Sequence, residues 1–159
     1  MTTTTEQMRA WAGPSILTYG FRPFFLGAAL WAAFSMLLWI PMLMGHIAPP
    51  TAFDPVSWHA HEFLFGYLGA VIAGFLLTAV PNWTGAPDAR ARFIALAAGL
   101  WLAGRMAMWF SGQLSPVLVA VVDLAFVPIL AAKIATQLVR RPKPQNMIFL
   151  LLLAHGLED

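Results

Sequence analysis

Four apolar segments, each long enough to cross a bilayer, constrain this chain more than any other feature of its sequence. A helix needs about 20 apolar residues to span the hydrocarbon core. Stretches of about that length, bounded by charged residues, Pro or Gly, cover residues 24–45, 58–80, 93–111 and 116–139. A further apolar stretch begins at residue 146 and is too short to span. We predict an all-α, polytopic transmembrane helical bundle with four complete spans and a partial fifth, in a single membrane domain over residues 1–159.

The composition supports a membrane protein and excludes several other classes. The chain is 60% hydrophobic and 10% charged, whereas a soluble domain is about half apolar and a quarter charged. So few charges exclude a soluble enzyme, a nucleic-acid-binding module and a disordered tail, and the partner we expect is a lipid bilayer. The chain has no cysteine, so any metal must be held by His, Met or carboxylate side chains.

Basic residues alternate between the loops and predict the orientation. They lie before the first span, after the second and after the fourth: Arg9, Arg22, Arg90, Arg92, Arg140, Arg141 and Lys143. The other two loops, residues 46–57 and 112–115, carry no Lys or Arg. Because Lys and Arg are retained on the cytoplasmic side, we predict a cytoplasmic N-terminus. The short connections favour antiparallel neighbours, and we expect Pro81 to stop the second span.

Two ionisable residues of the third and fourth spans are predicted to form an intramembrane ion pair. Arg105 lies seven residues before Gly112, and Asp123 lies eight residues after Ser115. At the rise of an α-helix both sit about 10 Å below the outer surface, on adjacent antiparallel helices. The pair then either only links the two helices, or Arg105 also meets an anionic group such as a haem propionate.

The second span opens with Trp58, His59, Ala60, His61 and Glu62. Neutral imidazole is a common metal and haem ligand, and a nearby carboxylate can fix its tautomer. Residues two apart on a helix point in opposite directions, so the two histidines share a metal only if the helix begins after them. Otherwise each histidine belongs to a different metal centre, or one of them does not bind metal and only contacts a residue that does. The alternative is that both are polar caps at the membrane surface.

Glu62 begins a series of small or short side chains at four-residue spacing: Gly66, Ala70, Gly74 and Thr78. Such a seam lets membrane helices pack closely. We therefore expect Glu62 to face protein, with His59 on the same side one turn earlier.

Two further groups have weaker interpretations. Met42, Met44 and His46 lie on the same predicted side as His59 and His61, and thioether with imidazole suits Cu(I), although Met is also an ordinary filler of apolar helices. The role of His155 is undetermined. Six tryptophans are expected to anchor at the headgroup level: Trp31, Trp39, Trp58, Trp83, Trp101 and Trp109.

Four motifs, in order, resemble the N-terminal signatures of the NnrS family. They are GFRPFF at residues 20–25, WHAHEFLFG at residues 58–66, AGFLLTAVPNWTG at residues 73–85 and WLAGR at residues 101–105. The resemblance covers about residues 20–125. It implies a multi-pass protein of the bacterial inner membrane that contains haem and copper and protects cells against nitric oxide and nitrosative stress.

The same resemblance makes His59, His61 and Glu62 the leading cofactor-binding candidates and adds Arg105 as a motif position. The metal-binding candidates are His59, His61 and, from its place on the same predicted side, His46. Catalytic residues are unknown, and whether the protein is an enzyme is left open. Family members have more spans than this chain, so we expect a truncated frame, a short paralogue, or a piece that needs a second membrane subunit or self-association.

Two rival functions fit the same residues. In a transporter or channel subunit, Glu62, Arg105 and Asp123 would line a path for a small solute, a metal or a proton. In a truncated, non-catalytic fragment, the small-residue seam would serve only assembly.

Overall fold

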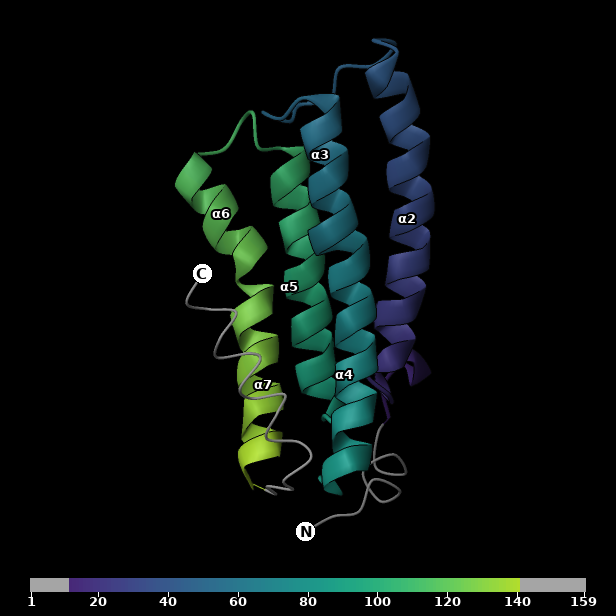
Figure 1. Ribbon diagram of the computed structural model, residues 1–159, viewed down its shortest axis with the longest axis vertical. Helices are drawn as coiled ribbons and strands as arrows, with labels where there is room; N and C mark the ends of the chain where they lie inside the picture. The colour runs from purple at the N-terminus through teal and green to yellow at the C-terminus, as the bar shows by residue number, and fades with distance from the viewer. Residues whose placement is uncertain (1–11, 141–159) are drawn as a thin grey trace.

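Long antiparallel helices make up the part of the chain that the structure describes (Figure 1). The computed structural model describes residues 12–140, so the expected fifth segment and His155 lie outside the described residues. The elements are η1 (Ser15–Leu17), α2 (Phe21–Leu43), α3 (Pro55–His61), η2 (Glu62–Leu68), α4 (Gly69–Thr84), α5 (Ala91–Trp109), α6 (Pro116–Leu124) and α7 (Phe126–Arg140). Within residues 12–140, four helical rods are long and apolar enough to cross a membrane: Phe21–Leu43, Pro55–Thr84, Ala91–Trp109 and Pro116–Val139. The predicted all-α bundle with four spans is confirmed.

Two of the rods begin with a side-chain N-cap followed by a proline in the first turn. The Asp54 carboxylate accepts hydrogen bonds of 3.0 Å from the backbone N–H groups of Val56 and Ser57, and Pro55 occupies the first turn of α3. Ser115 caps α6 in the same way, with Pro116 following it. A short polar acceptor followed by proline satisfies the free N–H groups of a helix start, so the sequence defines these two starts locally.

The expectation that Pro81 stops the second span is wrong. Pro81 is buried inside α4, which continues to Thr84. A proline disturbs the helix on its N-terminal side, where its nitrogen cannot donate and its ring crowds the carbonyl four residues earlier, so the turn that follows it can still form. The helix ends instead at Gly85, whose φ of 67° is the left-handed conformation typical of a glycine after a helix.

The fourth rod is broken at Ala125, between α6 and α7. Pro128 lies three residues further on, where its ring crowds the carbonyl of Leu124 and its nitrogen cannot donate. In Figure 1, α6 is tilted relative to α7; α6 packs against α5, whereas α7 runs beside α4. The break matters for function because Asp123 lies on the last turn before it.

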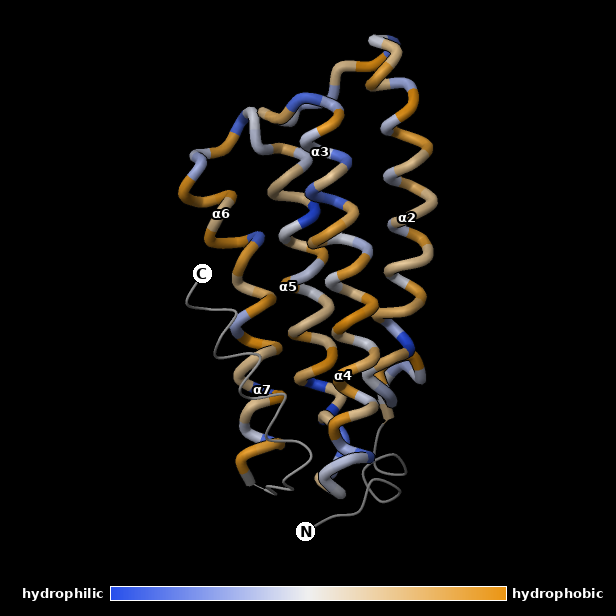
Figure 2. The backbone as a smooth tube through the Cα atoms, in the orientation of Figure 1, coloured by the Kyte–Doolittle hydropathy of each residue, from blue (hydrophilic) through white to orange (hydrophobic). Residues whose placement is uncertain are grey.

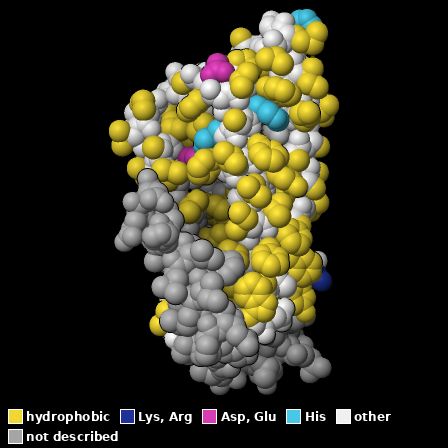
Figure 3. Space-filling model, viewed as in Figure 1, with side chains coloured by type: hydrophobic (Ala, Val, Ile, Leu, Met, Phe, Trp, Pro, Cys, Tyr) yellow, Lys and Arg dark blue, Asp and Glu magenta, His cyan; other side chains and the backbone are white. Residues whose placement is uncertain are grey.

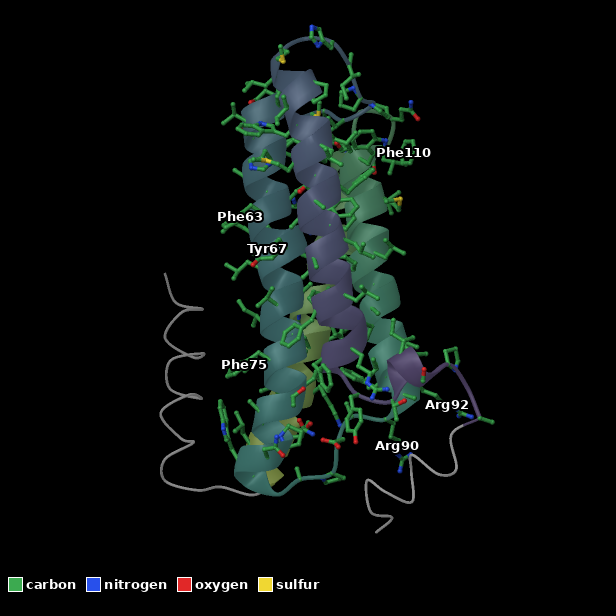
Figure 4. All side chains as sticks on the ribbon, turned by 90° about the vertical axis from the view of Figure 1, so that its right-hand side faces the viewer. Phe63, Tyr67, Phe75, Arg90, Arg92 and Phe110 are labelled. Carbon is green, nitrogen blue, oxygen red and sulfur yellow. The ribbon has the colours of Figure 1, made fainter. Side chains whose placement is uncertain are left out.

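The helices consist mostly of apolar residues (Figure 2), and many of their large apolar side chains are exposed, as expected for helices that face lipid. Arg90 and Arg92 lie at the end of the bundle opposite Phe110 (Figure 4). This arrangement agrees with the charge alternation in the sequence, and the cytoplasmic location of the N-terminus stays a prediction. In the interior of the bundle, α2 and α4 pack closely against each other.

The small-residue seam is largely buried. Glu62, Gly66, Ala70 and Gly74 are all inaccessible, and Thr78 is partly buried. Three of the six tryptophans predicted as interface anchors lie in the interior instead: Trp31, Trp58 and Trp101. For these three the anchor interpretation is wrong, because their rings are buried among the helices; those of Trp31 and Trp101 lie beside Gly66 and Gly27. Trp101, for example, packs edge-on against Trp31 and donates to the carbonyl oxygen of Gly66 over 2.9 Å.

Candidate functional site

The candidate site is built around a π-helical turn in the second rod. η2 starts at Glu62, directly after the last residue of α3, and returns to α-helix at Gly69. Single π-helical turns within α-helices are uncommon and are frequent at functional sites. The wider turn changes the direction in which the following side chains point. It places the Glu62 carboxylate, whose residue is 0% exposed, between three other helices.

Glu62 receives contacts from three elements. Trp31 Nε1, on α2, donates to Glu62 Oε2 over 2.7 Å. Arg105 Nε, on α5, lies 3.4 Å from the same oxygen. His61 Nδ1 lies 3.4 Å from Glu62 Oε1. A buried carboxylate is tolerated only when it is paired and hydrogen-bonded, and here these contacts supply both.

Arg105 connects the two buried carboxylates. Its Nη2 donates to Asp123 Oδ1 on α6, and the residue is 2% exposed. The structure thus places the predicted partners Arg105 and Asp123 in contact. Within residues 12–140 the Nη1 group of Arg105 has no hydrogen-bond partner, although it is buried. Among the same residues Nε, 3.4 Å from Glu62, also lacks a hydrogen bond, so several N–H donors of the guanidinium are left for other acceptors.

His61 lies between the two carboxylates. Its Nε2 is 3.0 Å from Asp123 Oδ2, its Nδ1 faces Glu62 Oε1, and its ring stacks on Phe65 with centroids 4.6 Å apart. Both ring nitrogens thus face acceptors, and an imidazole that donates through both is the imidazolium cation. In that form the four groups, which we call the charge cluster (His61, Glu62, Arg105 and Asp123), carry two positive and two negative charges.

His59 and Glu62 both face α2, through Trp39 and Trp31, as their spacing of three residues predicts. What the spacing does not predict is that His61 also contacts the Glu62 carboxylate. A hydrogen-bonded His61 has no free nitrogen to offer a metal ion in this arrangement.

Glycines allow the cluster to pack this closely. A Cβ atom on Gly66 would lie 2.5 Å from Trp31 Nε1 and 2.9 Å from Glu62 Oε2. A Cβ atom on Gly104 would lie 3.0 Å from Asp123 Oδ1. The approach of the tryptophan to the carboxylate and of α5 to α6 therefore requires the absence of a side chain at these two positions.

His59 faces a different helix. Its ring stacks on Trp39 of α2, with centroids 4.2 Å apart and an interplanar angle of 15°. In the described part of the chain, His59 Nδ1 and Trp39 Nε1 are buried without hydrogen-bond partners. Because α3 begins at Pro55, both histidines are helical, and they point to separate environments as the spacing of two residues predicts. His59 therefore keeps a buried nitrogen that no group within residues 12–140 uses.

The structure does not bring the other metal candidates together. Met42 is buried, whereas Met44 and His46 are exposed. Among residues 12–140 no group of three or more His, Asp or Glu side chains is arranged to hold a metal ion.

Two cavities flank the charge cluster. One, of about 410 Å³, is lined by His61 and Asp123 and by residues of the loop before α3 and the start of α6. The other, of about 210 Å³, is lined by Arg105 and Asp123 and lies deeper in the bundle. Histidine and acidic side chains that reach the surface gather in the same half of the molecule (Figure 3). Asp123 and Phe65 separate the two cavities.

Comparison with known proteins gives one match. The family model described as NnrS protein matches residues 15–157, nearly the whole chain. No curated protein and no solved structure matches the chain.

Proposed function

Because the chain belongs to the NnrS family, we propose that it is a haem-binding protein of the bacterial inner membrane that takes part in resistance to nitric oxide and nitrosative stress. The family supplies the chemistry of the proposal. The observation in the fold that carries it is His59, whose buried Nδ1 has no hydrogen-bond partner among the described residues.

His59 is the residue that fits an axial ligand. A neutral imidazole nitrogen with its lone pair free can bind haem iron, and haem iron, when present, supplies the centre to which nitric oxide binds. The parallel Trp39 ring restricts the rotation of the imidazole and provides a flat apolar wall. Both side chains are contributed by long helices, which hold them more rigidly than loops would.

The charge cluster supports this site without ligating the group. Glu62 and Asp123 engage both nitrogens of His61, so the segment that carries His59 is held to α5 and α6. Arg105 is matched by the same two carboxylates. This balance makes Arg105 a poor partner for a haem propionate, because a further negative charge in the cluster would have no counterpart.

Copper is the less supported part of the proposal. Thioether and imidazole donors suit Cu(I), but Met42 is buried away from the exposed Met44 and His46. A copper ion at this end of α2 would be held by Met44 and His46 alone.

A haem titration tests the proposal. The full chain, purified in detergent, is titrated with haem while its absorption spectrum is recorded. We expect a saturable Soret band in the wild type and its loss in His59→Ala. His46→Ala is the matched control and should keep the band. A wild type without a Soret band, or an unchanged band in His59→Ala, would contradict the ligand assignment.

A second function is favoured by the two cavities that meet at Asp123. A carboxylate reached from both sides is a suitable exchange point for a proton or a small solute that crosses the membrane. Flux in proteoliposomes that needs no metal and is abolished by Glu62→Gln would support transport. An absence of flux in the wild type would remove this alternative.

A further inference from the structure

The deeper cavity beside Arg105, which we call the arginine pocket, has the properties of a ligand site. It has a volume of about 210 Å³ and lies between the second rod, α5 and the region where α6 meets α7. Three aromatic side chains line it: Phe65, Trp101 and Phe126. Two polar side chains, Arg105 and Asp123, also line it. Apolar and aromatic walls with a few convergent polar groups are typical of sites for small organic molecules.

The guanidinium of Arg105 in this pocket has N–H donors without hydrogen-bond partners among the described residues. Arg105 has five N–H donors in fixed directions. Its Nη2 donates to Asp123, and its Nε lies 3.4 Å from Glu62. Its Nη1 is buried and lacks a hydrogen-bond partner within residues 12–140. A buried, charged donor without a partner is unfavourable, so the pocket favours a ligand that brings a hydrogen-bond acceptor.

The charges of the cluster decide what kind of acceptor fits. Arg105 contributes one positive charge, and Glu62 and Asp123 contribute two negative charges. Whether His61 is neutral or charged, the four groups sum to minus one or zero. No positive charge is left over for an anion, and an anion in a buried site without a counter-charge is costly. The acceptor should therefore be uncharged, as a carbonyl oxygen is.

The pocket is reached from the lipid side. Three of its lining residues are also exposed on the outer surface: Leu64 (53%), Ile72 (44%) and Val127 (49%). They form a window between the second rod and the start of α7. These three side chains are apolar and about half exposed, as side chains that face hydrocarbon are, so the ligand should be lipid-soluble. A ring in the pocket could extend an apolar tail through the window.

We propose that the arginine pocket binds an uncharged, lipid-soluble ring that carries a carbonyl group, of the chemical class of membrane quinones. The aromatic walls hold the planar ring, Arg105 Nη1 donates to the carbonyl oxygen, and the tail leaves between Leu64, Ile72 and Val127. This site does not depend on haem or on His59, which lies on the α2 side of the second rod.

Equilibrium binding to the full chain in quinone-free nanodiscs tests this proposal, with decylubiquinone as the probe and calorimetry as the readout. We expect saturable binding by the wild type. Val127→Trp fills the window and should weaken binding about tenfold or more, whereas Val121→Trp, an exposed valine of α6 away from both cavities, should leave it unchanged. Ile72→Trp blocks the window from the opposite wall and should act like Val127→Trp, so the test does not rest on the folding of one variant.

Two further probes test the chemistry of the ligand. Decylbenzene has the ring and tail without a carbonyl, and decanoate replaces the ring with an anion. Both should bind about tenfold or more weakly than decylubiquinone. The proposal is overturned if decylubiquinone shows no saturable binding, if either analogue binds as well, or if Val127→Trp and Ile72→Trp both bind like the wild type.

Discussion

Trp31 Nε1 donates a 2.7 Å hydrogen bond to Glu62 Oε2, and this contact ties α2 to the π-helical turn that follows α3. Arg105 on α5 approaches the same oxygen, so three of the four rods meet at one carboxylate. Asp123 adds the fourth rod through Arg105 and His61. The charge cluster is therefore the polar link of an otherwise apolar bundle, and its members should couple strongly.

The Trp31 hydrogen bond should contribute measurably to stability. Trp31→Phe removes the donor to Glu62 and should lower the free energy of unfolding by about 1.5–3 kcal/mol, the range for a hydrogen bond to a charged group. Trp39→Phe is the matched control, because Trp39 Nε1 has no partner among residues 12–140. Reversible unfolding in mixed micelles measures both. Equal losses in the two variants would show that the hydrogen bond is unimportant.

Gly66 should tolerate no side chain. In Gly66→Ala the new Cβ would lie 2.5 Å from Trp31 Nε1, so the tryptophan must move away from Glu62, at a cost of about 1–3 kcal/mol. A Cβ on Gly99 of α5 meets nothing within 4 Å, so Gly99→Ala should be neutral or stabilising by up to about 1 kcal/mol, as for an alanine in a helix. Thermal unfolding followed by circular dichroism compares them. A Gly66→Ala protein as stable as Gly99→Ala would contradict the close packing.

Arg105 and Asp123 should behave as a coupled pair. Asp123→Leu or Arg105→Met alone leaves a buried charge without its main partner, and each should cost about 3–5 kcal/mol. The double variant leaves His61 and Glu62 as a balanced pair. Its loss should therefore fall short of the sum of the single losses by about 0.5–3 kcal/mol. Strictly additive losses in the double-mutant cycle would mean that the two groups act independently.

Asp54 should make the start of α3 sensitive to acid. The Ser57 hydroxyl and the backbone N–H groups of Ser57 and Val56 hold the pKa of the Asp54 carboxyl below its ordinary value of 3.8. Because the pKa of Asp54 is lower in the folded state than in the unfolded state, the charged carboxylate stabilises the fold at pH values above 3.8. This stabilisation is lost as the pH falls below 3.8 and passes through the pKa of the folded state. Asp54→Asn, which caps without a charge, is the control. The difference in melting temperature between wild type and Asp54→Asn should shrink below pH 3.8 and stay constant above it; a constant difference throughout would contradict this role.

Length and charge were enough to predict the four rods, because bilayer thickness sets the length of an apolar helix and the loops carry the charges. The distances of Arg105 and Asp123 from their common loop put them at one depth, and the structure has them in contact. The small-residue seam also indicated which side of the second rod is buried. These features could be predicted because, in a regular helix, the spacing of residues in the sequence determines their depth and the face on which they lie.

What could not be predicted depends on irregular geometry and distant neighbours. The 3.6-residue period gives no sign of η2, and the contacts of His61 with Glu62 and Asp123 were not predicted. Trp31 lies 31 residues from Glu62 in sequence, and only the packing of α2 against the second rod reveals their hydrogen bond. Pro81 is a further case, because a proline close to a helix end permits the last turn to form.

The reaction of the haem-loaded full chain with nitric oxide tests the central claim most directly. Nitric oxide is added without oxygen to the reduced, haem-loaded protein in detergent, and the Soret band is recorded for the wild type, His59→Ala and His46→Ala. The account predicts a shifted Soret band in the wild type and in His46→Ala, and no such haem signal in His59→Ala. A wild-type spectrum that nitric oxide leaves unchanged, or an identical shift in His59→Ala, would contradict it.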